Sequence, residues 1–382
     1  MICEKKKCTG CSACLNICPK NAISMYEDEY GCIYPQIDTK KCINCGLCKK
    51  VCPQLNKNTF YYDSMKAYAM YCKNKDKRSE SSSGGAATLF YESVIDDNGV
   101  VYGASNLFGK DSFCFVKITN KQDLFKVKGS KYVHCYINNI YKDIRSELES
   151  NKKVLFIGTP CQVDGLKCYL MKEFENLYCV DIICHGVPSQ RLLFDELSNL
   201  KIDKKSVDYI IFRDDKRFTF KVIDKNKKVL IDKPSNDIWY YNNFLEGNIY
   251  RENCYNCRYA RRERVSDITI GDFWGLDKNC SIYDDEKKGI SLIIQNTHKG
   301  ATLIESIKSK SVIEERDLKE VYKENGQLNH PMKKNKKYDI FKNYYPLLGY
   351  EGACKKMISS KDRLKRIIKE KSILYKLYKG NK

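Results

Sequence analysis

The chain carries one cysteine pattern twice within its first 53 residues. The segments CTGCSACLNICP (8–19) and CINCGLCKKVCP (42–53) share the spacing C-x2-C-x2-C-x3-C-P. Cysteine thiolates with this spacing hold a cube of four irons and four sulfides. Zinc sites rarely place three cysteines at intervals of two and then repeat the whole pattern. The two segments therefore predict two 4Fe-4S clusters in a small N-terminal domain over residues 1–56.

The duplicated segments resemble the bacterial two-cluster ferredoxin. That resemblance implies that the fourth cysteine of each segment ligates the other cluster. One cluster would then take Cys8, Cys11, Cys14 and Cys52, and the other would take Cys42, Cys45, Cys48 and Cys18. Between the segments we expect a short helix and a hairpin. Cys3 and Cys32 lie outside the pattern, and we expect them to be buried structural residues.

Composition limits the class of protein. A chain of 382 residues with 42% hydrophobic content can bury the cores of two or three globular domains. Its 21 cysteines do not indicate a secreted disulfide scaffold, because such scaffolds are small and the start MICEKKKC has no apolar signal core. No apolar run approaches eighteen residues, so we expect no membrane span. The predicted location is the cytoplasm, with peripheral membrane attachment left open.

Basic residues are concentrated at the C-terminal end. The formal net charge is +20, and residues 331–382 hold sixteen Lys or Arg against four Asp or Glu. Apolar residues recur at helical spacing over 364–378, which predicts a basic helical tail over 331–382. Such a helix could touch an anionic membrane surface or an acidic protein, or pack on its own domain. Nucleic acid is a weak candidate partner, because the excess charge lies in a tail and not in a groove.

The central part of the chain alternates strands and helices. A strand over 67–71 precedes a helix from Ala86, and VLFIG (154–158) and a strand ending near Ile183 are each followed by a turn and a helix. This alternation predicts a mixed α/β fold with a partly parallel sheet. We place the N-terminal part of this body at 66–148 and its C-terminal part at 149–330.

Two loops of the body have the composition of anion sites. Ser82, Ser83, Gly84 and Gly85 precede the helix that begins at Ala86, and the free N–H groups there can bind an anion such as a flavin pyrophosphate. An ordinary helix cap would have the same composition. In KGSK, Lys128 and Lys131 flank a flexible turn that suits phosphate or an anionic ring, or is merely solvated.

Four further cysteines form a second candidate metal set. Cys161 and Cys184 follow two strands of the predicted parallel sheet, and Cys254 and Cys257 form a C-x2-C pair. The fold can bring these four thiols together around a third 4Fe-4S cluster; a structural pair with two unrelated buried cysteines is the alternative. Cys161 also begins a helix, where a catalytic thiolate is favoured. His185 is a candidate catalytic proton donor.

Several segments, in order along the chain, resemble the beta subunit family of coenzyme F420 hydrogenases and dehydrogenases. They are SSSGG, KGSKYV, GTPCQVDGLK, VDIICHGVPS, CYNCRYARRERVSDITIGDFWG and NHPMKKN. The resemblance therefore covers the chain from the first cysteine segment to about residue 345. Several matches of this length in the same order are much more specific than any one of them.

The resemblance implies an iron-sulfur flavoprotein with FAD in the body. The serine-glycine loop, Lys128, Lys131, Thr159, His185 and Gly186 would line the flavin, and the four body cysteines would hold the cluster, with Asp272 as an alternate ligand. Because clusters carry single electrons and many substrates take two, a flavin can convert between them. We therefore expect an oxidoreductase that links a ferredoxin or another redox protein to a small substrate, such as a deazaflavin. The alternative is a non-catalytic electron-transfer subunit that feeds a partner enzyme.

Overall fold

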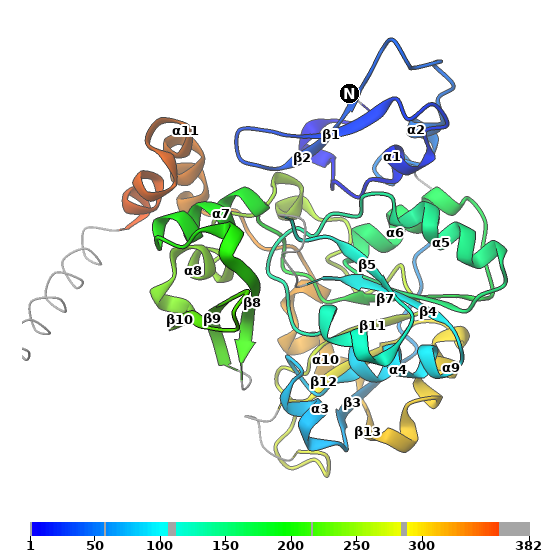
Figure 1. The fold of residues 1–382 in the computed structure, drawn as a ribbon. Coiled ribbons are helices and arrows are strands. Elements are labelled where there is room, and N and C mark those ends of the chain that lie inside the picture. Colours follow the sequence, from blue (N-terminus) through cyan, green and yellow to red (C-terminus); the bar gives the residue numbers. More distant parts are fainter. Residues whose placement is uncertain (1, 57–58, 106–111, 215–216, 284–288, 359–382) are drawn as a thin grey trace, which may run out of the picture.

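The computed structural model describes residues 2–56, 59–105, 112–214, 217–283 and 289–358. Figure 1 shows a small N-terminal module at one end of a larger body. A three-stranded sheet with its helices lies at the side of this body. The predicted mixed α/β fold is confirmed.

The module is built from two short helices and a hairpin. Its elements are α1 (Ala13–Ile17), β1 (Ile23–Glu27), β2 (Ile33–Ile37) and α2 (Leu47–Lys50). The expected hairpin is present, with β1 antiparallel to β2 from Ile23 opposite Ile37. No helix lies between the two cysteine segments in the described residues. Instead, each segment contains its own helix, which ends shortly before the fourth cysteine.

An eight-stranded sheet forms the body, in the order β13-β3-β12-β11-β7-β6-β4-β5. Its strands are β3 (Lys66–Cys72), β4 (Val100–Ala104), β5 (Phe115–Ile118), β6 (Val154–Gly158), β7 (Leu177–Ile182), β11 (Ile268–Asp272), β12 (Ser291–Gln295) and β13 (Ser311–Arg316). The four central strands β11, β7, β6 and β4 are parallel, and the outer strands are antiparallel to their neighbours. The predicted parallel core is therefore present.

Helices cover both faces of this sheet. On one face lie α5 (Ile140–Glu149) and α6 (Pro160–Leu170), and on the other lie α4 (Ala86–Asp96) and α9 (His298–Glu305). The residues of β6 alternate between the two hydrophobic cores, with Val154 and Phe156 on the first side and Leu155 and Ile157 on the second. A strand buried on both faces explains why this segment is apolar throughout. The short helices α3 (Lys75–Ser79) and α10 (Leu318–Glu324) lie near β3.

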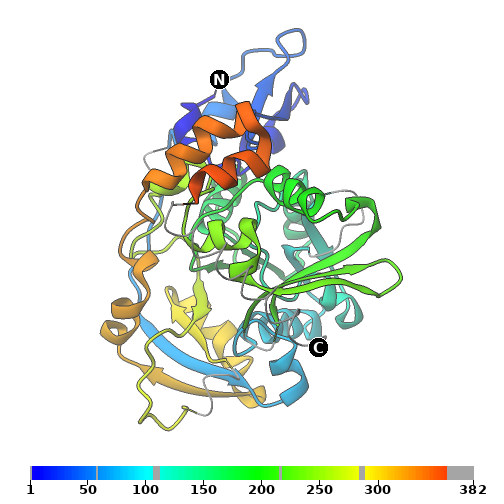
Figure 2. The same ribbon diagram turned by 90° about the vertical axis from the view of Figure 1, so that its left-hand side faces the viewer.

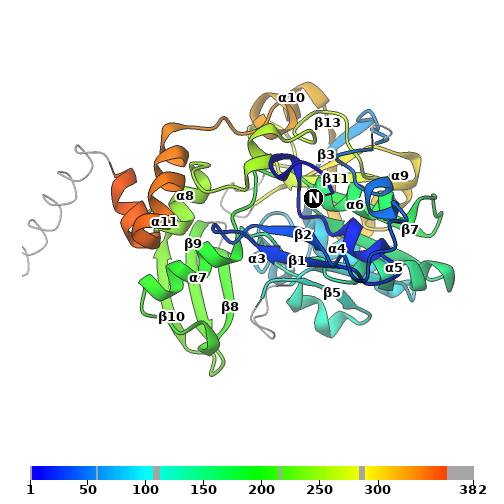
Figure 3. The ribbon, with the colours of Figure 1, turned by 90° about the horizontal axis from the view of Figure 1, so that it is seen from above.

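A second, smaller unit packs beside the sheet. It contains β8 (Val207–Asp214), β9 (Arg217–Asp224) and β10 (Val229–Pro234), with α7 (Gln190–Asn199), α8 (Trp239–Leu245) and α11 (Lys336–Met357). Figure 2 and Figure 3 show α11 lying against this unit, near the module. The tail helix expected over 364–378 lies outside the described residues. Within the described ranges, no helix combines the length and apolarity needed to cross a bilayer.

Candidate functional site

The first predicted ligand set gathers around one cavity of the module. Cys8, Cys11, Cys14 and Cys52 all line it, although Cys52 comes from the second segment. All four side chains are buried. This placement is the crossed arrangement that the ferredoxin resemblance implies.

Cys3 lies in the same cavity, a position that sequence reasoning did not assign to it. Its thiol hydrogen-bonds to Cys8 and Cys52 and lowers the pKa of both. Burial acts in the opposite direction on Cys11 and Cys14 and raises their pKa values. The cavity therefore holds five thiols, four of them in the predicted pattern.

The second predicted set is much more exposed. Cys45 is exposed, while Cys18, Cys42 and Cys48 are half-buried. Cys18 follows α1, and its sulfur accepts a 3.2 Å hydrogen bond from the Ala22 N–H. Cys42 and Cys45 lie on the segment that leads into α2, and Cys48 lies within α2. This set therefore occupies the solvent-facing side of the module.

The four body cysteines line a single cavity. Cys161 lies at the start of α6 directly after β6, and Cys184 follows β7. Cys254 lies within a 3-10 turn at Glu252–Asn256, and Cys257 follows that turn. Because β6 and β7 are parallel neighbours, their carboxyl ends lie side by side and bring Cys161 and Cys184 together. The cavity contains about 590 Å³ of space not filled by atoms, part of it open to solvent.

The donor set of this cavity suits an iron-sulfur cluster better than a single ion. Among the described residues, no three His, Cys, Asp or Glu side chains converge closely enough to hold one metal ion. In a four-iron cube each thiolate binds a different iron, so the sulfurs stand around the cube. Burial raises the pKa of Cys161 and Cys184 to about 12. Since metal binding requires thiolates, bound metal would have to supply the compensating positive charge.

Desolvation disfavours a free thiolate at Cys161, although the side chain is only half-buried. Its sulfur lies 3.2 Å from the Thr159 hydroxyl, which lowers the pKa but does not offset the larger effect of burial. Thr159 and Gln162 form a capping box at the start of α6. The catalytic role predicted for Cys161 stays a prediction.

His185 and Gly186 belong to the same cavity. Burial lowers the pKa of His185, and the charge of Asp272 partly offsets that effect. Gly186 has a φ of +135°, and a Cβ there would lie 2.4 Å from the Tyr250 ring. Only glycine fits this turn without a shift of its neighbours.

Asp272, the alternate ligand, has another partner. Its carboxylate accepts a hydrogen bond from Arg213 Nη1 at 2.9 Å, and the Arg213 side chain is nearly buried. This ion pair joins the end of β11 to β8. The pairing favours a structural or electrostatic role for Asp272 over metal ligation.

The predicted flavin residues fall into two groups. Thr159, His185 and Gly186 lie at the cysteine cavity, whereas the serine-glycine loop contacts the KGSK turn through a 2.8 Å hydrogen bond from the Ser130 N–H to Ser82 Oγ. Tyr132 lies between the groups, since its hydroxyl interacts with both Ser130 and Arg213. A line of polar side chains therefore runs from Ser82 toward the cavity.

Both predicted phosphate lysines contact protein groups. Lys128 pairs with Glu80 at 2.6 Å. Lys131 Nζ donates to the carbonyl oxygens of Val127, Lys128 and Gly129 at 2.7 to 2.9 Å. Ser83 Oγ likewise donates to the Ile290 carbonyl at 3.0 Å. The two lysines thus stabilise the turn itself.

The loop glycines have steric roles. A Cβ at Gly84 would lie 2.2 Å from the Met70 carbonyl oxygen, so this loop packs directly on β3. Gly85 caps α4 with a φ of +97°, a left-handed conformation that favours glycine.

Arg251 joins the module to the body cavity and was not predicted. It is 1% exposed and lines the body cavity. Nε donates to the Cys8 carbonyl and Nη2 to the Ile33 carbonyl, both at 2.8 Å, and the guanidinium lies 4.3 Å from the Tyr34 ring centre. Among the described residues, its Nη1 has no hydrogen-bond partner. A buried cation with an unused donor favours a negatively charged group in the cavity.

Helix α6 makes a second connection between the two cavities. A Cβ at Gly165 would lie 2.9 Å from the Cys11 Cβ, so α1 packs closely on α6 at this point. Cys161 is four residues earlier on the same helix, so it lies on the same face, one turn away. The two cysteine cavities are therefore separated by about one turn of helix.

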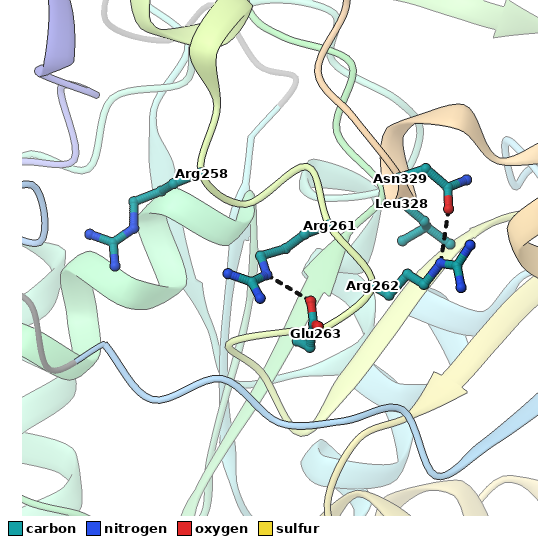
Figure 4. A pocket seen from close by; sticks show the side chains of 6 residues that line it. All are labelled: Arg258, Arg261, Arg262, Glu263, Leu328 and Asn329. Atoms are coloured by element: carbon teal, nitrogen blue, oxygen red, sulfur yellow. Dashed lines mark hydrogen bonds and ion pairs between the residues drawn. The ribbon is translucent and has the colours of Figure 1, made fainter.

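An arginine-rich hollow lies beside the body cavity. Figure 4 shows its lining, which consists of Arg258, Arg261, Arg262, Glu263, Leu328 and Asn329. Arg258 directly follows Cys257 and donates to the Pro53 carbonyl of the module at 2.7 Å. Arg261 pairs with Glu263 at 2.7 Å, and Arg262 donates to Asn329 at 3.0 Å.

Comparisons with known proteins agree with this architecture. Residues 151–321 match the family model for the C terminus of the coenzyme F420 hydrogenase/dehydrogenase beta subunit, and residues 7–56 match the 4Fe-4S dicluster domain. A chain of the xenon-derivatised F420-reducing NiFe hydrogenase complex from Methanosarcina barkeri is 15% identical, with a TM-score of 0.48, over 77% of this chain and 91% of that one. No curated protein was found to match. Residues 151–321 are therefore similar to the C terminus of the coenzyme F420 hydrogenase/dehydrogenase beta subunit, and residues 7–56 are similar to a 4Fe-4S dicluster domain, in agreement with the motifs of the sequence.

Proposed function

We propose that this protein is an iron-sulfur flavoenzyme that exchanges electrons between a ferredoxin-like carrier and a small two-electron substrate. One observation carries the proposal. Four cysteines from separate parts of the chain line one cavity, and that cavity adjoins the first cysteine set of the module. A purely structural C-x2-C pair would not require Cys161 and Cys184 at the same cavity.

The ligand assignment follows from this placement. We assign one cluster to Cys8, Cys11, Cys14 and Cys52, a second to Cys18, Cys42, Cys45 and Cys48, and a third to Cys161, Cys184, Cys254 and Cys257. When bound, the clusters would supply one-electron transfer and a flavin would couple single electrons to a two-electron substrate. The chain's own contribution is to hold these thiols close together and to bury the first set and Cys254.

We place FAD along the polar line from Ser82 to His185. Ser82 and Ser130 would orient the cofactor at one end, and Thr159, His185 and Gly186 would contact it at the other. Between these ends, the nearly buried Arg213 forms an ion pair with Asp272, which holds one positive and one negative charge in place. Desolvation lowers the pKa of His185 and so favours the neutral imidazole, which suits hydrogen bonding or proton transfer at the substrate. A deazaflavin or another small organic acceptor is the proposed substrate class.

Cofactor analysis after anaerobic purification tests the proposal. We expect about twelve irons per chain, an equal amount of sulfide and one FAD. Cys184→Ala should remove about four irons, whereas the matched Cys354→Ala, which changes a buried cysteine far along the chain in α11, should remove none. About eight irons in the unmodified protein would refute the body cluster.

A second measurement distinguishes the two proposed roles, an enzyme and a non-catalytic electron-transfer subunit. With a reduced ferredoxin present, the purified protein alone should reduce a soluble deazaflavin or another small acceptor. A flavin-free preparation that reduces only a partner enzyme would instead identify a non-catalytic relay.

A further inference from the structure

The segment that carries most of the second cysteine set forms the outer end of the module. We call residues 38–50 the module tip. In Figure 1 and Figure 2 the part of this segment between β2 and α2 lies on the side of the module away from the body, and α2 (Leu47–Lys50) forms the end of the segment. Cys45 is exposed, and Ile43 is 57% exposed. A Cβ at Gly46 would have no neighbour within 4 Å, so the surface there is open.

Lysines surround this apolar centre. Lys40, Lys41, Lys49 and Lys50 are all exposed, and residues 39–56 contain no Asp or Glu. Lys41 pairs with Asp38 at 3.6 Å. Within the described ranges, the other three make no ion pair. A segment that exposes an isoleucine together with three lysines that form no ion pair among the described residues is complementary to an acidic surface with an apolar centre.

We propose that the module tip is the docking surface for an acidic one-electron carrier protein. This inference rests on the proposed function, because it requires a cluster held by the cysteines of the tip. One electron would leave the reduced carrier, which is thereby oxidised, and would reduce that cluster; no bond is made or broken. Cys45 is the ligand nearest to solvent, so a carrier bound at the tip approaches the cluster more closely than from the buried first set.

The shape of the tip favours a protein over a small molecule. Small ligands bind in concave sites that cover most of their surface, whereas the tip projects into solvent. The arginine hollow is the competing basic surface, but two of its three arginines already have side-chain acceptors in Glu263 and Asn329. The lysines of the tip retain more of their charge for a partner.

Binding of an oxidised acidic ferredoxin to the cluster-loaded protein tests the inference. We would measure the dissociation constant by titration calorimetry under anaerobic conditions at low and high salt. Replacing Lys40, Lys49 and Lys50 with Glu should weaken binding at least about tenfold at low salt, and the difference should shrink at high salt. The same charge change at Lys225 and Lys228, which are exposed in the connection between β9 and β10, and at the exposed Lys233 of β10 is the matched control and should leave binding unchanged.

Two further variants make the result specific. Ile43→Ser should weaken binding without changing its dependence on salt, because it removes apolar contact and no charge. Arg261→Glu with Arg262→Glu should have little effect. If that pair weakens binding and the tip variant does not, the carrier docks at the hollow and the inference is refuted.

A reduction measurement keeps this result separate from the proposed function. A singly sulfonated viologen, whose one-electron-reduced form has no net charge, should reduce the clusters of the tip variant as fast as those of the unmodified protein and is itself oxidised by one electron. Equal iron content and normal viologen reduction, combined with unchanged ferredoxin binding, would refute the docking surface alone. Missing iron in the unmodified protein would refute the proposed function.

Discussion

Replacement of Arg251 with methionine should make local separation of the module from the body easier. Methionine fills a similar volume but cannot donate to the carbonyls of Cys8 and Ile33, which the guanidinium contacts at 2.8 Å. The change also removes the cation that lies 4.3 Å from the centre of the Tyr34 ring. All of these contacts cross from the body to the module.

The size of the effect can be worked from these contacts. Leaving each buried carbonyl unpaired costs about 1 kcal/mol or more, and a desolvated cation–π contact contributes about 1 kcal/mol. Together they predict that local separation of the module becomes easier by about 3 kcal/mol. Because about 1.4 kcal/mol changes an equilibrium constant tenfold, the opening constant should rise roughly a hundredfold.

Amide hydrogen exchange, followed by mass spectrometry under anaerobic conditions, measures this opening. Protection should fall in β2 and around Cys8 and should stay unchanged in β6 and β7. Arg145→Met is a matched control, because Arg145 also donates to a carbonyl, that of Tyr169, and lies 4.2 Å from an aromatic ring centre, but both partners belong to the body. Arg251→Lys should fall between the two, since it keeps the charge and loses the paired geometry. Unchanged protection of β2 in Arg251→Met would refute this reasoning.

The remaining predictions concern single sites. Gly165→Ala should lower the amide-exchange protection of α1, because the new Cβ would lie 2.9 Å from the Cβ of Cys11. Gly129→Ala would place its Cβ more than 4 Å from its described neighbours, so it should lower the stability measured by thermal unfolding by only about 1 kcal/mol, through backbone strain. Ser82→Ala should lower the free energy of unfolding by about 1 kcal/mol and should lower the amount of flavin that stays bound during gel filtration. If the variant kept all of its flavin, the placement of FAD would be contradicted. Burial lowers the pKa of His134 to about 3, below its value of about 6.5 in the unfolded chain, so the unfolded state binds more protons as pH falls below 6.5. Stability should therefore drop by about 1.4 kcal/mol between pH 7.5 and pH 5.5 in denaturant titrations, and the His134→Gln variant should lack that component.

Local spacing made much of the fold and part of the site predictable. The cysteine segments are short and dense, and the strand-turn-helix order around Thr159 and Ser189 is signalled by Pro160 and by the caps themselves. Parallel neighbours then place the residues after β6 and β7 at one edge. Cys161 and Cys184 could therefore be predicted as neighbours before any contact was known.

Residues that depend on docking of the module could not be predicted in this way. Arg251 lies more than 200 residues from Cys8 in sequence, and nothing near it indicates that its donors serve the module. Gly165 and Cys3 are likewise defined only by what packs against them. The two lysines of the KGSK turn show the opposite case, since their charge suggested an anion site while their contacts lie within the protein.

The packing also orders the three cysteine sets. Cys45 of the second set is exposed to solvent, the first set is buried beneath it in the module, and Cys161 of the body lies one helical turn from the residue that contacts Cys11. The second and first sets share α1 and α2, because Cys14 and Cys18 lie in and just after one helix and Cys48 and Cys52 flank the end of the other. Each step between sets is therefore spanned by a single short helix, and no domain movement is needed to connect them. A carrier at the module tip and a substrate near His185 would thus lie at opposite ends of one fixed series of thiols, and this separation would keep the proposed two-electron chemistry away from the surface where the proposed carrier would bind.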